Sequence, residues 1–148
     1  MGQARELMDR VTGVLLSKDF EKLREFYAPH AIAVTPDAGE LRGADEIIEY
    51  FRAMAEAFPT MSYESVGTYD SGDCAIDQGD MLAHNTGPIH MPDGQTLPAT
   101  GKQVRVRSMD IATVHGGKIV RHEWYWDQLE LLVQLGLLEA PAQTTGES

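Results

Sequence analysis

Two side chains able to transfer protons lie on strand-like segments in the second half of the chain, Asp110 and His122. The alternation of residues 104–114 places Asp110 on the same face as Val104 and Val106. A carboxyl group among apolar side chains is costly to ionise unless it is paired, and its pKa rises. A histidine beside a carboxylate has its tautomer set by that neighbour and can act as a base near neutral pH. We therefore predict a catalytic pair, the alternative being a hydrogen-bonded pair with a structural role.

The segment 119–126 supplies the surroundings of His122. Its alternation predicts one face with Val120, His122, Trp124 and Trp126, and a second face with Ile119, Arg121, Glu123 and Tyr125. Both tryptophans of the chain share the face of His122, which is typical of a ligand cavity with flat apolar walls. Gly116-Gly117 predicts a hairpin between the two segments, so Asp110 and His122 should project into the same space.

Further residues are expected to contact a substrate in this cavity, although most of them also suit an ordinary core. They are aromatic, sulfur-containing or small polar side chains: Trp124, Trp126, Tyr63, Phe51, Met54, Ser108 and His84. His84 is included because it precedes a Gly- and Pro-rich loop, residues 85–100, that is long enough to cover a cavity mouth.

The elements that must position these residues follow from the hydrophobic periodicity. A period of 3.6 predicts helices over 4–16, from Asp19 to Pro29 with Phe26 and Tyr27 on its apolar stripe, and after Gly43. A period of two predicts strands over 30–35, 63–69, 74–84, 104–114 and 119–126. Asp127 and Glu130 predict the capping box of a short helix that Gly136 ends. The result is one α+β domain over residues 1–139, a curved, mostly antiparallel sheet around N-terminal helices, with a disordered tail over 140–148.

Composition excludes several classes of function. The formal net charge is −11 and the pI is about 4.7, which argues against nucleic acid or an anionic membrane as partner. Cys74 is the only cysteine and the five histidines are not closely spaced, so we expect no disulfide and no metal site. The acidic residues Asp70, Asp73, Asp77 and Asp80 suggest a solvated turn and strand face. Without an apolar run for a signal peptide or a membrane span, a cytoplasmic protein is expected.

The predicted outer face of the sheet mixes charged and apolar side chains. This mixture suits a contact between two sheets better than bare solvent, and it predicts a homodimer. Salt bridges on an exposed sheet are the alternative. The residues concerned are Arg105, Arg107, Met109, Ile111, Arg121, Glu123 and Tyr125.

Four segments carry a resemblance to a known family: FYAPHAIAVTP, ELRGADEIIEYFRAMAEAFP, GKQVRVRSMDIATVHGGKIV and YWDQLELLVQLG. From about Leu7 to Gly136 the chain resembles the SnoaL-like polyketide cyclases of the NTF2-like superfamily. The resemblance implies a cone-shaped α+β barrel enclosing one apolar pocket, a dimer or tetramer, and no metal or organic cofactor. Members of this family close the last ring of aromatic polyketides by intramolecular aldol condensation.

The chain departs from the cyclase pattern at one informative position. The cyclases carry His-x-Asp on the last strand, and the Asp is their proposed acid/base. Here His122 matches, but Trp124 fills the carboxylate position. Glu123 is one residue away and should face outward, because a shift by one residue reverses the face unless a bulge intervenes.

These observations lead to two hypotheses of different classes. The first is a cofactor-independent cyclase that forms a ring in a hydrophobic, polyketide-like substrate, with Asp110 and His122 moving protons. The second is a non-catalytic protein that binds a small hydrophobic molecule. An isomerase, a hydroxylase or an epoxide hydrolase of the same superfamily ranks lower; the epoxide hydrolase would need an arginine in the pocket, whereas Arg105 and Arg107 are predicted to point outward.

Overall fold

The computed structural model describes residues 2–91 and 93–139, so the tail predicted for 140–148 lies outside the described residues. Its helices are α1 (Gln3–Ser17), α2 (Phe20–Arg24), α3 (Gly43–Ala57) and α4 (Gln128–Gln134). Its strands are β1 (Tyr27–Thr35), β2 (Gly39–Arg42), β3 (Thr60–Ser71), β4 (Cys74–His84), β5 (Ile89–His90), β6 (Thr96–Leu97), β7 (Gln103–His115) and β8 (Lys118–Trp126).

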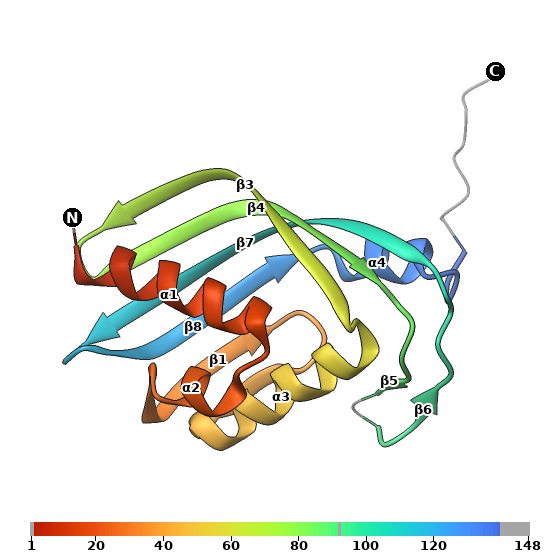
Figure 1. The fold of residues 1–148 in the computed structure, drawn as a ribbon, viewed down its shortest axis with the longest axis horizontal. Coiled ribbons are helices and arrows are strands. Elements are labelled where there is room, and N and C mark those ends of the chain that lie inside the picture. Colours follow the sequence, from red (N-terminus) through yellow and green to blue (C-terminus); the bar gives the residue numbers. More distant parts are fainter. Residues whose placement is uncertain (1, 92, 140–148) are drawn as a thin grey trace.

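Six of these strands form one curved sheet in the order β2-β1-β8-β7-β4-β3. The sheet arches over α1, α2 and α3, and α4 lies at the far end of β7 and β8 (Figure 1). Neighbouring strands are antiparallel except β1 and β8, which are parallel. The edge strands β2 and β3 do not pair with each other, so the α+β cone is open along one side. None of the described helices is long and apolar enough to cross a membrane.

The core fills the space between the concave face of the sheet and the helices. Its largest fully buried apolar side chains come from α1, α2, α3 and β8: Met8, Leu23, Ile47, Ile48, Phe51 and Ile119. The predicted bounds of β4 are confirmed, and β7 and β8 begin or end within a residue of prediction. Asp127 caps α4 by accepting a hydrogen bond from the Glu130 N–H, as expected.

The region from Asp19 to Pro29 differs from its prediction. The helix α2 ends at Arg24, and Tyr27 already belongs to β1, where it pairs in parallel with Ile119. The N–H of Ile119 donates to the carbonyl oxygen of Phe26 (2.8 Å), which fixes the start of this pairing. Pro29, which has no N–H, lies where the β1–β8 pairing is interrupted, a position in which a strand tolerates proline. The helical period of Phe26 and Tyr27 was therefore misleading.

The predicted face of Ile119 is also wrong, because this side chain is fully buried. The pairing of β7 with β8 changes from Val114–Ile119 to Thr113–Arg121, so Val120 is an additional residue on β8. Such a bulge reverses the alternation on one side of it. From Arg121 onward the predicted faces hold, with His122 on the concave side.

The predicted loop 85–100 contains a small hairpin, β5–β6, and is held by one buried side chain. The Asn85 amide donates to the carbonyl oxygens of Ala57 and Gly87, and its oxygen accepts from the N–H and the hydroxyl of Thr100. Gly87 is required here, since a Cβ would lie 1.8 Å from the carbonyl oxygen of Glu56. The loop is thus fixed to the end of α3.

A buried arginine attaches α1 to the sheet. The Arg5 guanidinium donates to Asp77 (2.6 and 2.7 Å), to Asp9 (2.8 Å) and to Asp70 (3.0 Å). The prediction that Asp77 lies on a solvated face is wrong, because Asp77 is buried on the concave side. Its register partner on β7 is Asp110. The Arg5 guanidinium therefore pairs with three carboxylates, and a fourth carboxylate, that of Asp110, lies opposite Asp77 on the neighbouring strand.

This crowding controls the ionisation of Asp77. Burial, followed by the charge of Asp110, raises the pKa of Asp77 to about 6, although the charge of Arg5 acts in the opposite direction. The folded protein therefore holds this proton more tightly than the unfolded chain, in which the pKa is ordinary. The stabilisation is complete below the unfolded pKa and is lost as the pH rises through about 6.

We predict that the difference in unfolding free energy between wild type and Asp77→Asn depends on pH. A rise of the pKa from the ordinary 3.8 to about 6 is worth about 3 kcal/mol at roughly 1.4 kcal/mol per pH unit, and the wild type should lose most of this stability relative to the variant between pH 4 and pH 7. Urea unfolding at several pH values measures this. Asp73→Asn removes one exposed carboxylate from the neighbouring turn as a charge control. A difference that does not change with pH would contradict the account of Asp77.

Candidate functional site

Three side chains from three strands form a continuous hydrogen-bonded chain on the concave face. His122 Nε2 lies 2.7 Å from Asp110 Oδ2, and His122 Nδ1 lies 2.7 Å from the hydroxyl oxygen of Tyr27. His122 is only 1% exposed, whereas the Asp110 side chain keeps 16% of its surface accessible. Asp110 is therefore the member of this chain that another molecule can reach.

The Asp110 carboxylate determines which nitrogen of the neutral imidazole carries the proton. Burial, followed by the charge of Asp110, raises the pKa of Tyr27 well above its usual value, so the phenol keeps its proton. The Asp110 carboxylate can only accept, so Nε2–H donates to it and Nδ1 accepts from the Tyr27 hydroxyl. His122 thus holds the carboxylate in one orientation.

The indole ring of Trp124 packs on the imidazole ring of His122. The two rings are stacked, with centroids 3.6 Å apart and planes inclined by 24°. Phe51 of α3 packs edge-on against the indole, with a centroid distance of 5.3 Å. Trp124 is also the register partner of Asp110. The indole therefore covers the imidazole, whereas the Asp110 carboxyl group on the neighbouring strand stays partly accessible.

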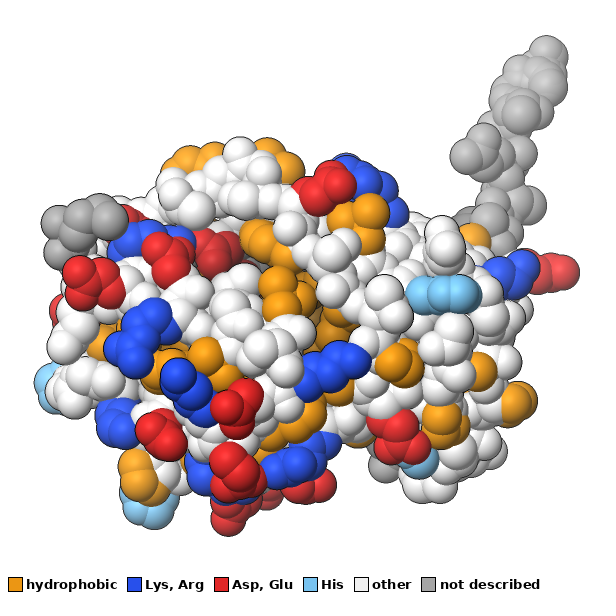
Figure 2. Space-filling model, viewed as in Figure 1, with side chains coloured by type: hydrophobic (Ala, Val, Ile, Leu, Met, Phe, Trp, Pro, Cys, Tyr) orange, Lys and Arg blue, Asp and Glu red, His pale blue; other side chains and the backbone are white. Residues whose placement is uncertain are grey.

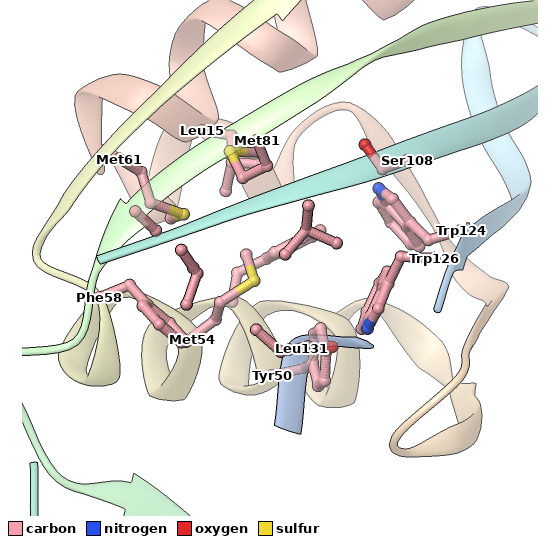
Figure 3. Close-up of a pocket in the computed structure, with 14 residues that line it drawn as sticks. Leu15, Tyr50, Met54, Phe58, Met61, Met81, Ser108, Trp124, Trp126 and Leu131 are labelled. Atoms are coloured by element: carbon pink, nitrogen blue, oxygen red, sulfur yellow. The ribbon is translucent and has the colours of Figure 1, made fainter. Parts of the chain in front are cut away.

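Beyond the indole lies an apolar cavity of about 100 Å³ between α1, α3, α4 and the sheet. Trp124, Trp126 and Ser108 lie at one end, and Met54, Phe58 and Met61 at the other (Figure 3). On the surface, a recess with hydrophobic side chains opens where the ends of α1 and α3 approach β3 (Figure 2). The remaining lining residues are Leu15, Tyr50, Phe51, Met81, Ala83, Val104, Val106 and Leu131.

The structure brings together most of the residues expected to contact a substrate. Phe51, Met54, Ser108, Trp124 and Trp126 all line the cavity. Neither Asp110 nor His122 is among the lining residues, although Asp110 follows Ser108 by two positions on the same face of β7.

Two of the expected contacts lie outside the lining. Tyr63 is on the concave side of β3, where its ring packs over Gly79. His84 is paired with the Gly101 carbonyl oxygen through Nε2 (3.0 Å) and borders a shallow groove with Leu82 and Gln103. Residues 86–102 contribute no side chain to the cavity lining among the described residues.

Glu123 does not supply the carboxylate that is missing from the concave face because position 124 is a tryptophan. Its carboxylate accepts from Tyr125 (2.9 Å) and from Arg121 (3.1 Å) on the outer face of the sheet. These two hydrogen bonds lower the pKa of Glu123, and the bond from Tyr125 has the larger effect. It stays ionised and faces away from the cavity.

Sequence reasoning missed Tyr27, the third member of the hydrogen-bonded chain. Its place next to His122 depends on the parallel pairing of β1 with β8, which no local pattern announces. As regards metals, no group of three His, Cys, Asp or Glu side chains in the described part of the chain is arranged to hold an ion.

Comparisons with known proteins agree with this architecture. The sequence pattern of the SnoaL-like domain matches residues 4–122. A candidate SnoaL-like polyketide cyclase from Jannaschia sp. CCS1 superposes with a TM-score of 0.80 at 18% identity, covering 94% of both chains. TsrD from Streptomyces laurentii gives 0.75 at 24% identity, covering 92% of this chain and 96% of its own.

A third solved structure is IdmH from Streptomyces antibioticus, a candidate polyketide cyclase. Its TM-score is 0.72 at 23% identity, covering 91% of this chain and 99% of IdmH. Identities this low establish a common fold rather than a common reaction. No significant match was found among curated proteins. Since the family pattern covers well over half of the chain and the folds agree, the protein belongs to the SnoaL-like domain family and has the NTF2-like fold.

Proposed function

We propose that this protein is a cofactor-independent cyclase that closes a carbocyclic ring in a hydrophobic, polyketide-like substrate. The observation that carries the proposal is a partly accessible carboxyl group, Asp110, held by His122 two positions along β7 from Ser108, which lines an apolar cavity walled by both tryptophans. A carboxylate that is oriented beside an apolar cavity suits proton abstraction next to a carbonyl group. The family of the neighbours supports the same class of reaction.

The proposed reaction needs one proton acceptor and a folded substrate. The Asp110 carboxylate removes a proton from the carbon next to a substrate carbonyl, which leaves an enolate. The enolate carbon attacks a second carbonyl of the same molecule, and the new alkoxide takes the proton back from Asp110. His122 and Tyr27 act as positioning residues for the carboxylate. Holding the two carbons in contact can contribute roughly 7–11 kcal/mol to lowering the barrier.

The size of the cavity limits the substrate. About 100 Å³ is less than the roughly 300–1,000 Å³ typical of sites for larger ligands. Met54, Met61 and Met81 line the cavity, and their unbranched side chains can move aside at low cost. We therefore favour substrates of one or two rings.

We predict that the wild type converts ortho-acetylphenylacetone into a methylnaphthol, by one intramolecular aldol step and loss of water. Asp110→Asn should lower the rate at least a hundredfold, because an amide cannot accept the proton. Tyr27→Phe should lower it less, since the carboxylate remains while the hydrogen bond from the phenol to His122 Nδ1 is lost. Naphthol absorbance and the loss of one water in the mass spectrum measure the product.

Glu123→Gln is the matched control for this prediction. It removes a carboxylate from the adjacent strand position on the outer face, and the rate should stay unchanged. If Asp110→Asn stays within about threefold of wild type, or if Glu123→Gln is the slower variant, the proposed role of Asp110 is wrong.

A second candidate function is supported by one observation. The imidazole is covered by Trp124, and neither member of the pair lines the cavity, which also suits a protein that only binds a small hydrophobic molecule. Saturable binding of the diketone without formation of product would favour this function over the cyclase.

We also propose a homodimer formed through the outer face of the sheet. Large hydrophobic side chains are exposed there, including Met109 and Tyr125 on adjacent strands. The charges around them are already paired within the chain, Arg121 with Glu123 and Arg105 with Glu64. A face that mixes exposed methionine, tyrosine and paired arginines resembles the composition of protein interfaces.

We predict that the double substitution Met109→Glu, Tyr125→Glu halves the molar mass measured by light scattering, because two carboxylates would be buried against their own copies. Leu129→Glu, at an exposed hydrophobic position on α4, should leave the mass unchanged. A wild type that is monomeric at micromolar concentration would contradict the dimer.

A further inference from the structure

The hydroxyl group of Tyr63 is buried, yet no protein group among the described residues forms a hydrogen bond with it. It is the one buried side-chain polar atom in the described part of the chain in this condition. Native proteins rarely leave a buried donor unpaired, because it has lost its hydrogen bonds to water without a replacement. A group of this kind requires an explanation beyond packing.

The backbone around Tyr63 accommodates the phenol at a defined place. Its ring lies across Gly79 of β4, where a Cβ would come within 2.4 Å of Cζ and 2.5 Å of the hydroxyl oxygen. Any side chain at position 79 would therefore displace the phenol. Gly79 pairs with Ser108, whose hydroxyl donates to the Gly79 carbonyl oxygen (3.3 Å). The phenol thus lies beside the Ser108 end of the cavity.

The charges around the phenol make it a donor. Burial, followed by the charges of Asp77 and Asp110, raises the pKa of Tyr63 to about 12, although the charge of Arg5 acts in the opposite direction. The hydroxyl keeps its proton throughout the physiological pH range. Its fitting partner is therefore an oxygen with free lone pairs.

A flexible side chain of the cavity lining is the strand neighbour of Tyr63. Met81 is the register partner of Tyr63 and lines the cavity. A methionine can change conformation with little loss of packing. The rest of the lining is almost entirely apolar, with Ser108 as its small polar group. A ketone in the cavity would otherwise lose its hydrogen bonds to water.

We infer that Tyr63 donates a hydrogen bond to a carbonyl or enolate oxygen of the bound molecule at the Ser108 end of the cavity. This inference rests on the proposed function, since it assigns the polar contact for the ligand of the same cavity. It makes Tyr63 a residue that selects oxygenated over hydrocarbon ligands. In the free protein the Tyr63 hydroxyl is left without a hydrogen bond, which lowers the stability of the fold in exchange for this selectivity.

A pair of probes that differ by one oxygen tests the inference: alpha-tetralone, a bicyclic ketone, and tetralin, its hydrocarbon counterpart. Both tryptophans of the chain line the cavity, so their two indole N–H signals in nitrogen-15 NMR spectra report binding directly. The wild type should bind the ketone more tightly. Tyr63→Phe should weaken ketone binding about tenfold, the value of one hydrogen bond, and leave tetralin binding unchanged.

Thermal unfolding of the ligand-free protein gives an independent measurement. If the hydroxyl has no partner in the protein, Tyr63→Phe should raise the midpoint of unfolding, whereas a structural hydroxyl would make the variant less stable. Tyr69→Phe is the matched control, because this tyrosine lies on the same strand but is exposed and bonded to Gln78. Its binding of both probes should equal that of the wild type.

The outcomes separate the two proposals. If Tyr63→Phe weakens both probes equally or neither of them, or lowers the midpoint of unfolding, the role of Tyr63 is overturned while the ligand cavity stands. If neither probe shifts the indole signals of the wild type, the cavity is not a binding site for such molecules, and the inference about Tyr63 is overturned with it.

Discussion

The hydrogen bond between Asp110 and His122 is the interaction on which the account of this site depends. It joins neighbouring strands on the concave face, and Tyr27 completes it from the far side of the imidazole. The arrangement needs a residue inserted into β8 at Val120 and the parallel pairing of β1 with β8. Without either feature, His122 would lie on another face or lack its second partner. The bulge at Val120 thus helps to determine where His122, two residues later, can bond to Asp110.

The concave face carries more charge than an apolar core normally contains. Asp77 lies opposite Asp110 and pairs with Arg5, so the row of polar groups extends from α1 across the sheet to β1. Burial of these groups is costly, and the raised pKa of Asp77 is one sign of that cost. Folds tolerate such violations mainly at functional sites, where the rest of the structure compensates for them. The large apolar core on both sides of the row provides that compensation here.

Much of this arrangement could be predicted from the sequence. Alternation over β7 and over residues 121–126 of β8 predicted which side Asp110, Trp124 and Trp126 face, because a period of two holds wherever no bulge interrupts the strand. The outward orientation of Glu123 followed from the same period. The match of its residues to the SnoaL-like pattern extended this reasoning to the whole fold. Function at the level of a substrate did not follow, since relatives with the same fold share little sequence.

The remaining features depend on contacts between distant segments. The bulge at Val120 and the switch from α2 to β1 before Tyr27 are decided by pairing with other strands, and local propensity favoured the wrong answer at both places. The ion pair of Arg5 with Asp77 joins residues 72 positions apart, so no local pattern in the sequence connects them. Likewise, only the tertiary structure reveals that Trp124 covers His122.

The protonation of the His122 ring tests the central claim most directly. Nitrogen-15 NMR of the imidazole distinguishes a ring protonated at Nε2 from one protonated at Nδ1. The account predicts that the neutral ring carries its proton on Nε2, donated to Asp110, with Nδ1 accepting from Tyr27. It also predicts that Tyr27→Phe shifts the Nδ1 resonance. A proton on Nδ1, or a ring that exchanges freely between the two forms, would contradict the account.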